Sequence, residues 1–287
     1  SAPGGSLLRV RAGAYVTAMS SLPALETLLN GYGRVLLGYS GGVDSALLAV
    51  VGRRRLGPER FLAVIGTSAS YPAVQYHAAR ALATQFEIPV RELETLELID
   101  PAYRANTPDR CYFCKQELWS RLGALARTEG FDTVIDGTNA DDLGDHRPGH
   151  RAGQEHRIRS PLAELGWTKA MVREMAATLG LPVSDQPAAP CLASRIRYGI
   201  EVTPARLAQV EAAEAALRAL GVRGDLRVRH RGDHATVEVT PAMFELVRQH
   251  WATVETRLLA LGFDRVVLEP EGYRRGALLH DLAVTRA

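Results

Sequence analysis

The chain has 287 residues, 46% of them hydrophobic and 23% charged, a size and composition that allow one large or two moderate globular domains. Its net charge of +2 and pI of about 8.5 disfavour a nucleic-acid partner, which usually demands a concentrated basic surface, and favour small anionic ligands. No segment approaches the roughly 20 apolar residues of a membrane helix, so we expect a soluble, cytoplasmic protein.

Residues 1–18 precede Met19 and open with Ser-Ala-Pro-Gly-Gly. They carry no sustained hydrophobic period, and we expect a tag remnant or a disordered extension there. The first folded domain is predicted to span residues 19–199.

Short apolar runs alternate with helix-like segments after Arg34. Strands are predicted at 35–39, 61–66, 90–93 and 133–136, and helices at 43–53, 72–86, 115–128 and 169–179. This alternation predicts an α/β fold, a parallel sheet with helices on both faces. The polar, glycine-containing stretch at 141–159 is typical of a surface loop beside an active site.

The remaining residues, 200–287, predict a small α+β domain that binds substrate or mediates oligomerisation. Helices are expected at 203–220 and 241–261, and strands at 225–229, 235–239 and 265–268. The strand predictions rest on alternating polar and apolar residues, and the helix predictions on the 3.6-residue period.

The most specific motif is Ser-Gly-Gly-Val-Asp-Ser at residues 40–45, where the first strand ends and a helix begins. Glycines let backbone N–H groups approach a phosphate, serine hydroxyls donate hydrogen bonds, and the helix N-terminus adds partial positive charge. A carboxylate beside that anion, Asp44, must hold Mg²⁺ or orient the loop. We expect ATP to contact Gly38, Ser40, Gly41, Gly42, Asp44 and Ser45.

The motif resembles the PP-loop of NAD synthetases, GMP synthetases, asparagine synthetases and tRNA thiolation enzymes. The resemblance implies the adenine nucleotide alpha hydrolase-like fold and cleavage of ATP between its α and β phosphates. No lysine follows the glycines, so transfer of the terminal phosphoryl group is disfavoured. The alternative is an ordinary glycine-rich turn from strand to helix.

A second polar segment, Gly137 to Asp142, directly follows the strand predicted at 133–136. Ligands of open α/β sheets bind at the carboxyl ends of the strands, so Thr138, Asn139 and Asp141 are expected beside the nucleotide. Asp141 is a candidate Mg²⁺ ligand together with Asp44. Alternatively, these residues only cap a loop and the turn after it.

Three cysteines, Cys111, Cys114 and Cys191, are candidate metal ligands or catalytic groups. The Cys-x-x-Cys spacing lets two thiolates meet one metal or one another, and Cys191 lies in a distant loop. From the residues alone, a disulfide, three buried thiols, or a zinc site completed by His146, His150 or His156 also stay open.

Together these segments resemble the LarE family of ATP-dependent sulfur transferases, over most of the chain from Leu25 to Gly276. The matching segments are 40–45, 111–115, 137–142, Asp145 with 147–149, and 191–195. The resemblance implies that ATP adenylates a carboxylate of pyridinium-3,5-dicarboxylate mononucleotide and that sulfur then replaces the oxygen, in nickel-pincer nucleotide biosynthesis. It also implies a homo-oligomer.

The resemblance further implies a role for the cysteines. In LarE proteins with all three, the thiolates hold a 4Fe-4S cluster whose fourth iron can carry an extra sulfide, so Cys111, Cys114 and Cys191 are expected to be catalytic and to hold this cluster. Members with only the cysteine matching Cys191 give up its sulfur and retain dehydroalanine. The sulfur donor, sulfide or a donor protein, is left open.

Five further residues match LarE positions around the phosphate and substrate pocket: Ser194, Arg195, Arg227, Arg229 and Glu238. Two of them, Arg227 and Arg229, alternate along a predicted strand and so point to one face. Paired guanidinium groups can grip a phosphate or carboxylate bidentately. The alternative is a solvated basic strand face.

Two other features receive no firm role. Tyr112 and Trp119 could stack on a base, but aromatic residues at helical spacing usually belong to the core. The segment 269–277, Glu-Pro-Glu-Gly-Tyr-Arg-Arg-Gly-Ala, departs from the family's ending, and we assign it no function.

The sequence therefore predicts an ATP-dependent sulfurtransferase that releases AMP and pyrophosphate. A tRNA thiolation enzyme would use the same chemistry but normally has a basic surface. An amide-forming synthetase would use ammonia and would not need the cysteines. A nucleotide-binding regulator would bind ATP without releasing pyrophosphate.

Overall fold

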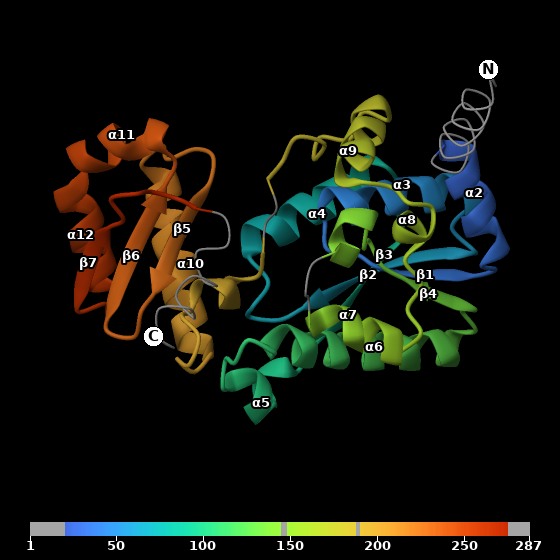
Figure 1. The fold of residues 1–287 in the computed structure, drawn as a ribbon, viewed down its shortest axis with the longest axis horizontal. Helices are drawn as coiled ribbons and strands as arrows, with labels where there is room; N and C mark the ends of the chain where they lie inside the picture. Colours follow the sequence, from blue (N-terminus) through green and yellow to red (C-terminus); the bar gives the residue numbers. More distant parts are fainter. Residues whose placement is uncertain (1–20, 145–147, 188–189, 275–287) are drawn as a thin grey trace, which may run out of the picture. The chain divides into compact units, whose positions relative to one another are not determined.

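The computed structural model describes residues 21–144, 148–187 and 190–274 (Figure 1). The extension expected at 1–18 lies outside the described residues. Within the described ranges, no helix combines the length and apolar character needed to cross a bilayer.

The described chain divides into two compact units. The first contains residues up to Gly66, 74–95 and 115–186, and the second contains 67–73, 96–114 and the residues from Pro187 onward. The second unit thus gathers the region of Cys111 and Cys114 with that of Cys191. The domain boundary predicted near Gly199 stays a prediction.

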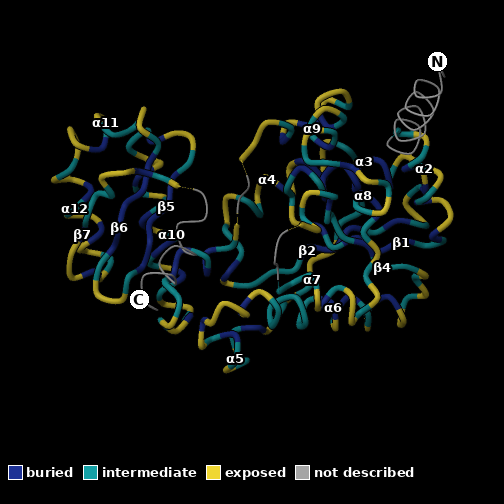
Figure 2. Tube along the Cα trace, in the orientation of Figure 1, coloured by how far each residue is buried: buried dark blue, intermediate teal, exposed yellow. Residues whose placement is uncertain are grey.

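The first unit is built on a parallel sheet, as predicted, and the order of its strands is β3-β2-β1-β4. Its strands are β1 (Val35–Gly38), β2 (Phe61–Thr67), β3 (Val90–Glu94) and β4 (Thr133–Ile135). Val35 on β1 pairs with Phe61 on one side and Thr133 on the other. Because β1 is covered on both faces, its apolar residues form a continuous buried run (Figure 2).

Helices cover both faces of this sheet, with α3 and α9 on one and α6 on the other (Figure 1). The helices of the unit are α2 (Leu22–Gly31), α3 (Val43–Leu56), α4 (Ala73–Gln85), α6 (Arg110–Glu129), α7 (Pro148–Glu155), α8 (Pro161–Glu164) and α9 (Lys169–Thr178). Of these, α6 begins in the second unit, and α9 packs against α3.

Several predicted boundaries are wrong. The helix predicted at 115–128 begins at Arg110, and the predicted loop at 141–159 contains a 3₁₀ turn, η2 (Ala140–Gly144), and helix α7. Pro148 is tolerated in α7 because it is the first residue, where no intrahelical N–H bond is lost. The helix predicted at 241–261 breaks at His250, whose φ of −104° and ψ of 15° are not helical.

The second unit contains a mixed three-stranded sheet in the order β5-β6-β7. Its strands are β5 (Leu226–His230), β6 (His234–Val239) and β7 (Arg265–Leu268), and its helices are α5 (Pro101–Arg104), α10 (Pro204–Ala219), α11 (Phe244–Gln249) and α12 (Trp251–Ala260), with 3₁₀ turns η1 (Glu97–Ile99), η3 (Leu192–Arg195) and η4 (Pro241–Met243). β5 and β6 are antiparallel, whereas β6 and β7 are parallel.

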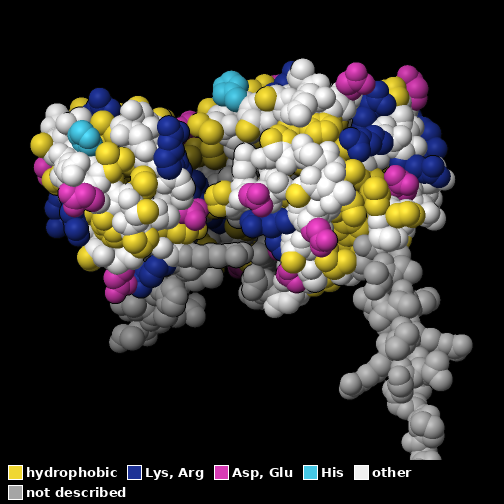
Figure 3. All heavy atoms as spheres, turned by 90° about the horizontal axis from the view of Figure 1, so that it is seen from above, with side chains coloured by type: hydrophobic (Ala, Val, Ile, Leu, Met, Phe, Trp, Pro, Cys, Tyr) yellow, Lys and Arg dark blue, Asp and Glu magenta, His cyan; other side chains and the backbone are white. Residues whose placement is uncertain are grey.

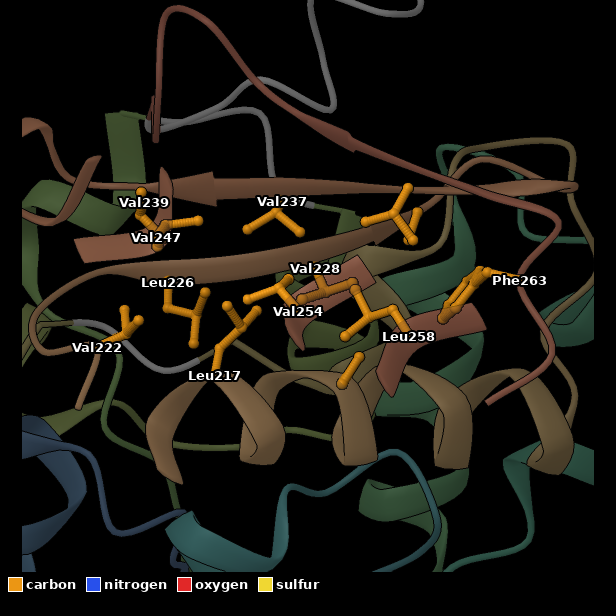
Figure 4. Close-up of a cluster of buried hydrophobic side chains, with 13 residues drawn as sticks. Leu217, Val222, Leu226, Val228, Val237, Val239, Val247, Val254, Leu258 and Phe263 are labelled. Carbon is orange, nitrogen blue, oxygen red and sulfur yellow. The ribbon is translucent and has the colours of Figure 1, made fainter. Parts of the chain in front are cut away.

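One face of this sheet carries the hydrophobic core of the unit. Leu226 and Val228 of β5 and Val237 of β6 point toward Leu217 of α10 and Leu258 of α12 (Figure 4). Because side chains alternate along a strand, the residues between them point to the other face. That opposite face therefore carries the charged residues of β5 and β6.

His230 is a buried histidine on the core face of β5. Its Nε2 lies 3.2 Å from Oε1 of Gln209, its Nδ1 accepts from the Gly232 amide at 3.2 Å, and its ring packs edge-on against Phe263. Burial, with smaller effects of Arg206 and His234, lowers the pKa of His230 to about 4. The folded protein therefore holds this imidazole neutral at physiological pH.

We predict that His230 makes the protein less stable below neutral pH. The unfolded chain takes up this proton near pH 6.5 and the folded chain only near pH 4, so the contribution is complete above pH 6.5 and is lost as the pH falls toward 4. The loss is at most about 3 kcal/mol. Urea unfolding of His230→Gln between pH 7 and 5 should show a flatter profile than wild type. The exposed His250→Gln is the control, and equal slopes in all three proteins would contradict the prediction.

Candidate functional site

The Ser40–Ser45 loop joins β1 to α3 in a conformation that depends on glycine. Gly41 has a φ of +73°, and a Cβ there would lie 2.6 Å from Cβ of Ala79. A Cβ on Gly42, in contrast, would meet only Oγ of Ser40, at 3.6 Å. The loop thus packs tightly at one glycine and leaves open space at the next.

Gly42 is the N-cap of α3 and gives that helix no side-chain cap. The first N–H groups of a helix need partners from outside the helix, and they attract anions. Ser45 is buried and closes the loop, because its Oγ donates to the Gly42 carbonyl at 3.0 Å and lies 3.2 Å from Oγ of Ser40. The geometry suits a phosphate at the start of α3.

A cluster of polar side chains surrounds Asp44 at this helix start. Nδ2 of Asn139 donates to Oδ1 of Asp44 at 3.1 Å, and the Asp141 amide donates to Oδ1 of Asn139 at 3.0 Å. Lys169 pairs with Oδ2 of Asp44, and its backbone N–H donates to Oδ2 of Asp141 at 2.8 Å. The structure therefore brings Asp44, Asn139 and Asp141 together, as expected, and adds Lys169, which the sequence analysis missed.

The contacts of Thr138 and Gly38 within the protein account for these two residue types without a nucleotide. The amide and hydroxyl of Thr138 donate to the Asp136 carboxylate at 3.1 and 2.8 Å, an Asx-type loop cap. A Cβ on Gly38 would lie 2.8 Å from the ring of Trp119, which is buried in the core. Gly137 approaches the loop itself, since a Cβ there would lie 2.9 Å from the Ser45 amide nitrogen.

The cysteines lie in the second unit. Because α6 begins at Arg110, Cys111 and Cys114 stand three residues apart on its first turn, a spacing that places two side chains on one helix face. Cys191 is the N-cap of the 3₁₀ turn η3. All three are free thiols, with Cys111 exposed and the other two half-buried, so no disulfide joins them.

Hydrophobic packing and charge link the three thiols. Cys114 and Cys191 pack against one buried cluster that includes Tyr103. Burial raises the pKa of Tyr103, and Cys191 and Cys114 add to that effect. Burial lowers the pKa of Arg110, but Cys191, Cys111, Tyr103 and Tyr198 together outweigh it, so the pKa is raised. Tyr103 and Arg110 thus lie close to the three cysteines.

The three thiols are candidate ligands of a metal centre. Among residues 21–144, 148–187 and 190–274, no three His, Cys, Asp or Glu side chains form a group that could hold a single metal ion. His146, one of the histidines considered as a zinc ligand, lies outside the described residues. A four-iron cluster spreads its thiolate ligands further apart than one ion does, so three free thiols are a fitting donor set.

A buried framework holds the loop that carries Cys191. Arg110 is 3% exposed and donates to Oδ1 of Asn106 at 2.6 Å and to the Ala193 carbonyl at 2.8 Å. Nδ2 of Asn106 donates to the carbonyls of Arg197 and Ile200, both at 2.9 Å. Asn106 adopts a φ of +53°, one of the few left-handed non-glycine residues.

Two bidentate ion pairs support the same loop, one of them made with α10 and the other within the β5–β6 sheet. Arg195 pairs with Glu214 at 3.0 and 3.2 Å and donates to the Cys191 carbonyl at 3.0 Å. Arg229 pairs with Glu238 at 3.0 and 2.9 Å and donates to the Ser194 carbonyl at 3.0 Å. In this structure these arginines position the loop. Glu214 lies in the middle of α10, and no sequence motif indicated that it would pair with Arg195.

Arg227 and Ser194 complete the set expected around a phosphate. Arg227 lies on the charged face of β5 with its guanidinium 5.1 Å from the ring centre of Tyr273. Burial, and then the charge of Arg195, lowers the pKa of Arg227. Oγ of Ser194 donates to the Cys191 carbonyl at 2.7 Å. The structure brings these residues together at the base of the Cys191 loop.

Comparisons with known proteins extend these observations. The sequence profile of the NAD synthase family matches residues 26–127. An uncharacterized protein of Synechocystis is 41% identical over 90% of this chain and 97% of its own length. The pyridinium-3,5-bisthiocarboxylic acid mononucleotide synthase of Lactiplantibacillus plantarum is 33% identical over 91% of this chain and 95% of its own. An uncharacterized protein of Methanocaldococcus jannaschii is 27% identical over 84% of this chain and 91% of its own.

We predict that Gly41→Ala weakens nucleotide binding. The left-handed φ and the clash with Ala79 both force the loop to move, and we expect ATP affinity to fall at least about tenfold. Gly57→Ala is the matched control, because Gly57 has a φ of +74° but nothing within 4 Å of an added Cβ. Titration calorimetry with Mg·ATP measures the difference, and equal affinities for the two variants would refute this account of the loop.

Proposed function

This chain belongs to the LarE family, and from that membership we propose that it is an ATP-dependent sulfur transferase of nickel-pincer nucleotide biosynthesis. The observation that carries the proposal is the near full-length match to the Lactiplantibacillus plantarum synthase. The PP-loop class to which the fold belongs implies ATP and Mg²⁺. The uncapped start of α3 supports a phosphate site in this chain.

The proposed reaction has two steps. A carboxylate oxygen of pyridinium-3,5-dicarboxylate mononucleotide attacks the α-phosphorus of ATP, and pyrophosphate leaves with the electrons of the broken P–O bond. A sulfur nucleophile then attacks the activated carbonyl carbon, and AMP leaves to give the thiocarboxylate. The Ser40–Ser45 loop would hold the pyrophosphate part, with Asp44 and Asp141 as the candidate Mg²⁺ ligands.

The cysteines would supply the sulfur. A 4Fe-4S cluster held by Cys111, Cys114 and Cys191 would provide a replaceable sulfide and allow repeated turnover. Without a cluster, Sγ of Cys191 would itself attack the activated carbonyl. Loss of its α-proton and cleavage of its Cβ–S bond would then leave dehydroalanine and release the thiocarboxylate. The framework of Arg110 and Arg195 would hold the loop in either version.

Thiolation of tRNA is less well supported than thiolation of a small molecule. On the face drawn in Figure 3, the described Lys and Arg side chains lie among Asp and Glu side chains, without a continuous basic patch. RNA-binding surfaces usually concentrate positive charge. The Lactiplantibacillus plantarum relative is a mononucleotide synthase by name, which favours a small-molecule substrate. A homo-oligomer stays part of the proposal.

We predict that Cys191→Ser separates the two steps. With Mg·ATP and the dicarboxylate mononucleotide, wild type should release AMP and pyrophosphate in equal amounts and form a thiocarboxylate visible by mass spectrometry. The variant should still release pyrophosphate in the first turnover but form no thiocarboxylate. Release of ADP by wild type would exclude the proposed chemistry, and a variant that forms as much thiocarboxylate as wild type would show that Cys191 does not deliver the sulfur.

We predict that anaerobic reconstitution with iron and sulfide gives a brown protein with about four irons per chain. Cys114→Ala should lose most of that iron and the visible absorption, because only two thiolates remain, while its circular dichroism spectrum should match wild type. Colourless wild-type protein under these conditions would remove the cluster. The mass of Cys191 after one turnover would then test whether its sulfur had been donated.

A further inference from the structure

The main-chain carbonyl of Cys191 receives more hydrogen bonds than holding the loop requires. Its oxygen accepts from the Ser194 hydroxyl at 2.7 Å, from the Ser194 amide at 3.0 Å and from Nη1 of Arg195 at 3.0 Å. Within the described ranges, the nearby Ala193 carbonyl has two donors, at 2.8 and 3.1 Å. A peptide oxygen has two lone pairs, so a third donor is used best when that oxygen carries additional negative charge.

The charged donor of this group is fixed from its far side. Arg195 is 4% exposed, and its Nε and Nη2 atoms pair with the Glu214 carboxylate at 3.0 and 3.2 Å. Its remaining nitrogen, Nη1, donates to the carbonyls of Cys191 and Pro190 and to the Ser194 hydroxyl. The guanidinium therefore needs no rearrangement to meet a negative oxygen at Cys191. Donors that are fixed in advance and shielded from water stabilise developing charge strongly.

Negative charge develops on this oxygen in one reaction of a cysteine residue. Removal of the α-proton leaves an electron pair on Cα, which is shared with the neighbouring carbonyl as an enolate. The pair then forms the Cα=Cβ bond, and the Cβ–S bond breaks with its electrons leaving on the sulfur. Dehydroalanine remains in the chain. An acylated sulfur leaves more readily than a free thiol, because it departs as a weakly basic thiocarboxylate.

We propose that Ser194 and Arg195 are catalytic residues that form an oxyanion site for this elimination at Cys191. The inference deepens the proposed function and rests on it, because it takes Cys191 as the source of the transferred sulfur. After Sγ has displaced AMP from the activated carbonyl, a solvent hydroxide takes the α-proton, the site stabilises the enolate, and the thiocarboxylate departs. Ser194 and Arg195 keep their own protons throughout.

The alternative is that these hydrogen bonds only hold the loop in place. Arg195 would then be equivalent to Arg110, another buried arginine that donates to a carbonyl of the same loop. Loss of either arginine would then affect the protein in the same way. An oxyanion site predicts instead that elimination at Cys191 depends on the donors to its own carbonyl.

The first measurement needs no nucleotide. The thiols of the full chain are converted to cyclic sulfonium groups with 2,5-dibromohexanediamide, which turns each sulfur into a good leaving group. Peptide mass spectrometry then follows dehydroalanine at each position as a fraction of the sulfonium formed. Position 191 should eliminate about 100-fold faster than positions 111 and 114, whose carbonyls lie within α6 and have ordinary helical donors. Ser194→Ala should slow elimination at position 191 about 100-fold, the usual effect of losing one oxyanion donor.

Two further variants keep the result interpretable. Arg195→Met combined with Glu214→Gln removes the ion pair as a unit, so that no unpaired charge stays buried, and it should slow elimination by a similar factor. Arg110→Met is the matched control, and its rate at position 191 should stay within about threefold of wild type. If the double variant does not fold, Ser194→Ala still decides, because it removes one hydroxyl and should melt within about 3 °C of wild type.

The second measurement uses iron-free protein with Mg·ATP and pyridinium-3,5-dicarboxylate mononucleotide. Wild type should form thiocarboxylate and dehydroalanine at position 191 in equal amounts. Ser194→Ala should stop between the two steps and accumulate a thioester on Cys191, visible as a gain of the acyl group in the mass of the intact chain. A residue that only holds the loop would not cause this intermediate to accumulate.

The outcomes separate this inference from the proposed function. If wild type does not release AMP but the sulfonium at position 191 still eliminates rapidly and depends on Ser194, the proposed function falls and the oxyanion site stands. If wild type forms thiocarboxylate but position 191 eliminates no faster than position 111, or as fast in Ser194→Ala, only the inference is overturned. An intact Cys191 beside the thiocarboxylate in iron-free protein would overturn it as well.

Discussion

The uncapped N-terminus of α3 is the constraint on which the first unit depends. The first N–H groups of a helix need hydrogen-bond acceptors from outside the helix, and an anion is a favoured one. The chain enters this helix through a glycine turn and not through a capping side chain. At position 41 only glycine fits, because any side chain would clash with Ala79. Gly137 permits β4 to approach the same point, and α9 places its first residue there. Strand order, glycine positions and helix packing thus converge on one anion site.

The second unit follows a different principle. One face of its small sheet is apolar and packs on helices, while the other holds the buried pair of Arg229 and Glu238. A second buried arginine, Arg195 of η3, pairs with Glu214 of α10. Burying ion pairs costs solvation energy and stabilises little, so such pairs often serve to specify one conformation. Here both arginines also donate to carbonyls of the Cys191 loop. Their charges act by fixing the Cys191 loop, which has little regular structure of its own.

Much of this arrangement was predictable from the sequence because it is local. The buried run of β1 and the glycine motif after it identified the parallel sheet and the phosphate loop. Contacts made across the chain could not be predicted in the same way: Lys169 meets Asp44 only after α9 packs on α3, and nothing near Glu214 shows that it will face Arg195. The start of α6 was misplaced because Cys111 to Cys114 has the appearance of a metal motif, although it forms a helical turn.

The Cys191 loop is anchored through its main chain. The carbonyls of Cys191, Ala193 and Ser194 accept hydrogen bonds from Arg195, Arg110 and Arg229, and none of these bonds uses the sulfur atom. If that sulfur were lost, the three carbonyl acceptors and their arginine donors would all still be present. A chain that had lost its sulfur would then keep the groups that hold this loop, and unfolding of the loop would be a poor signal for removing the inactive protein from the cell.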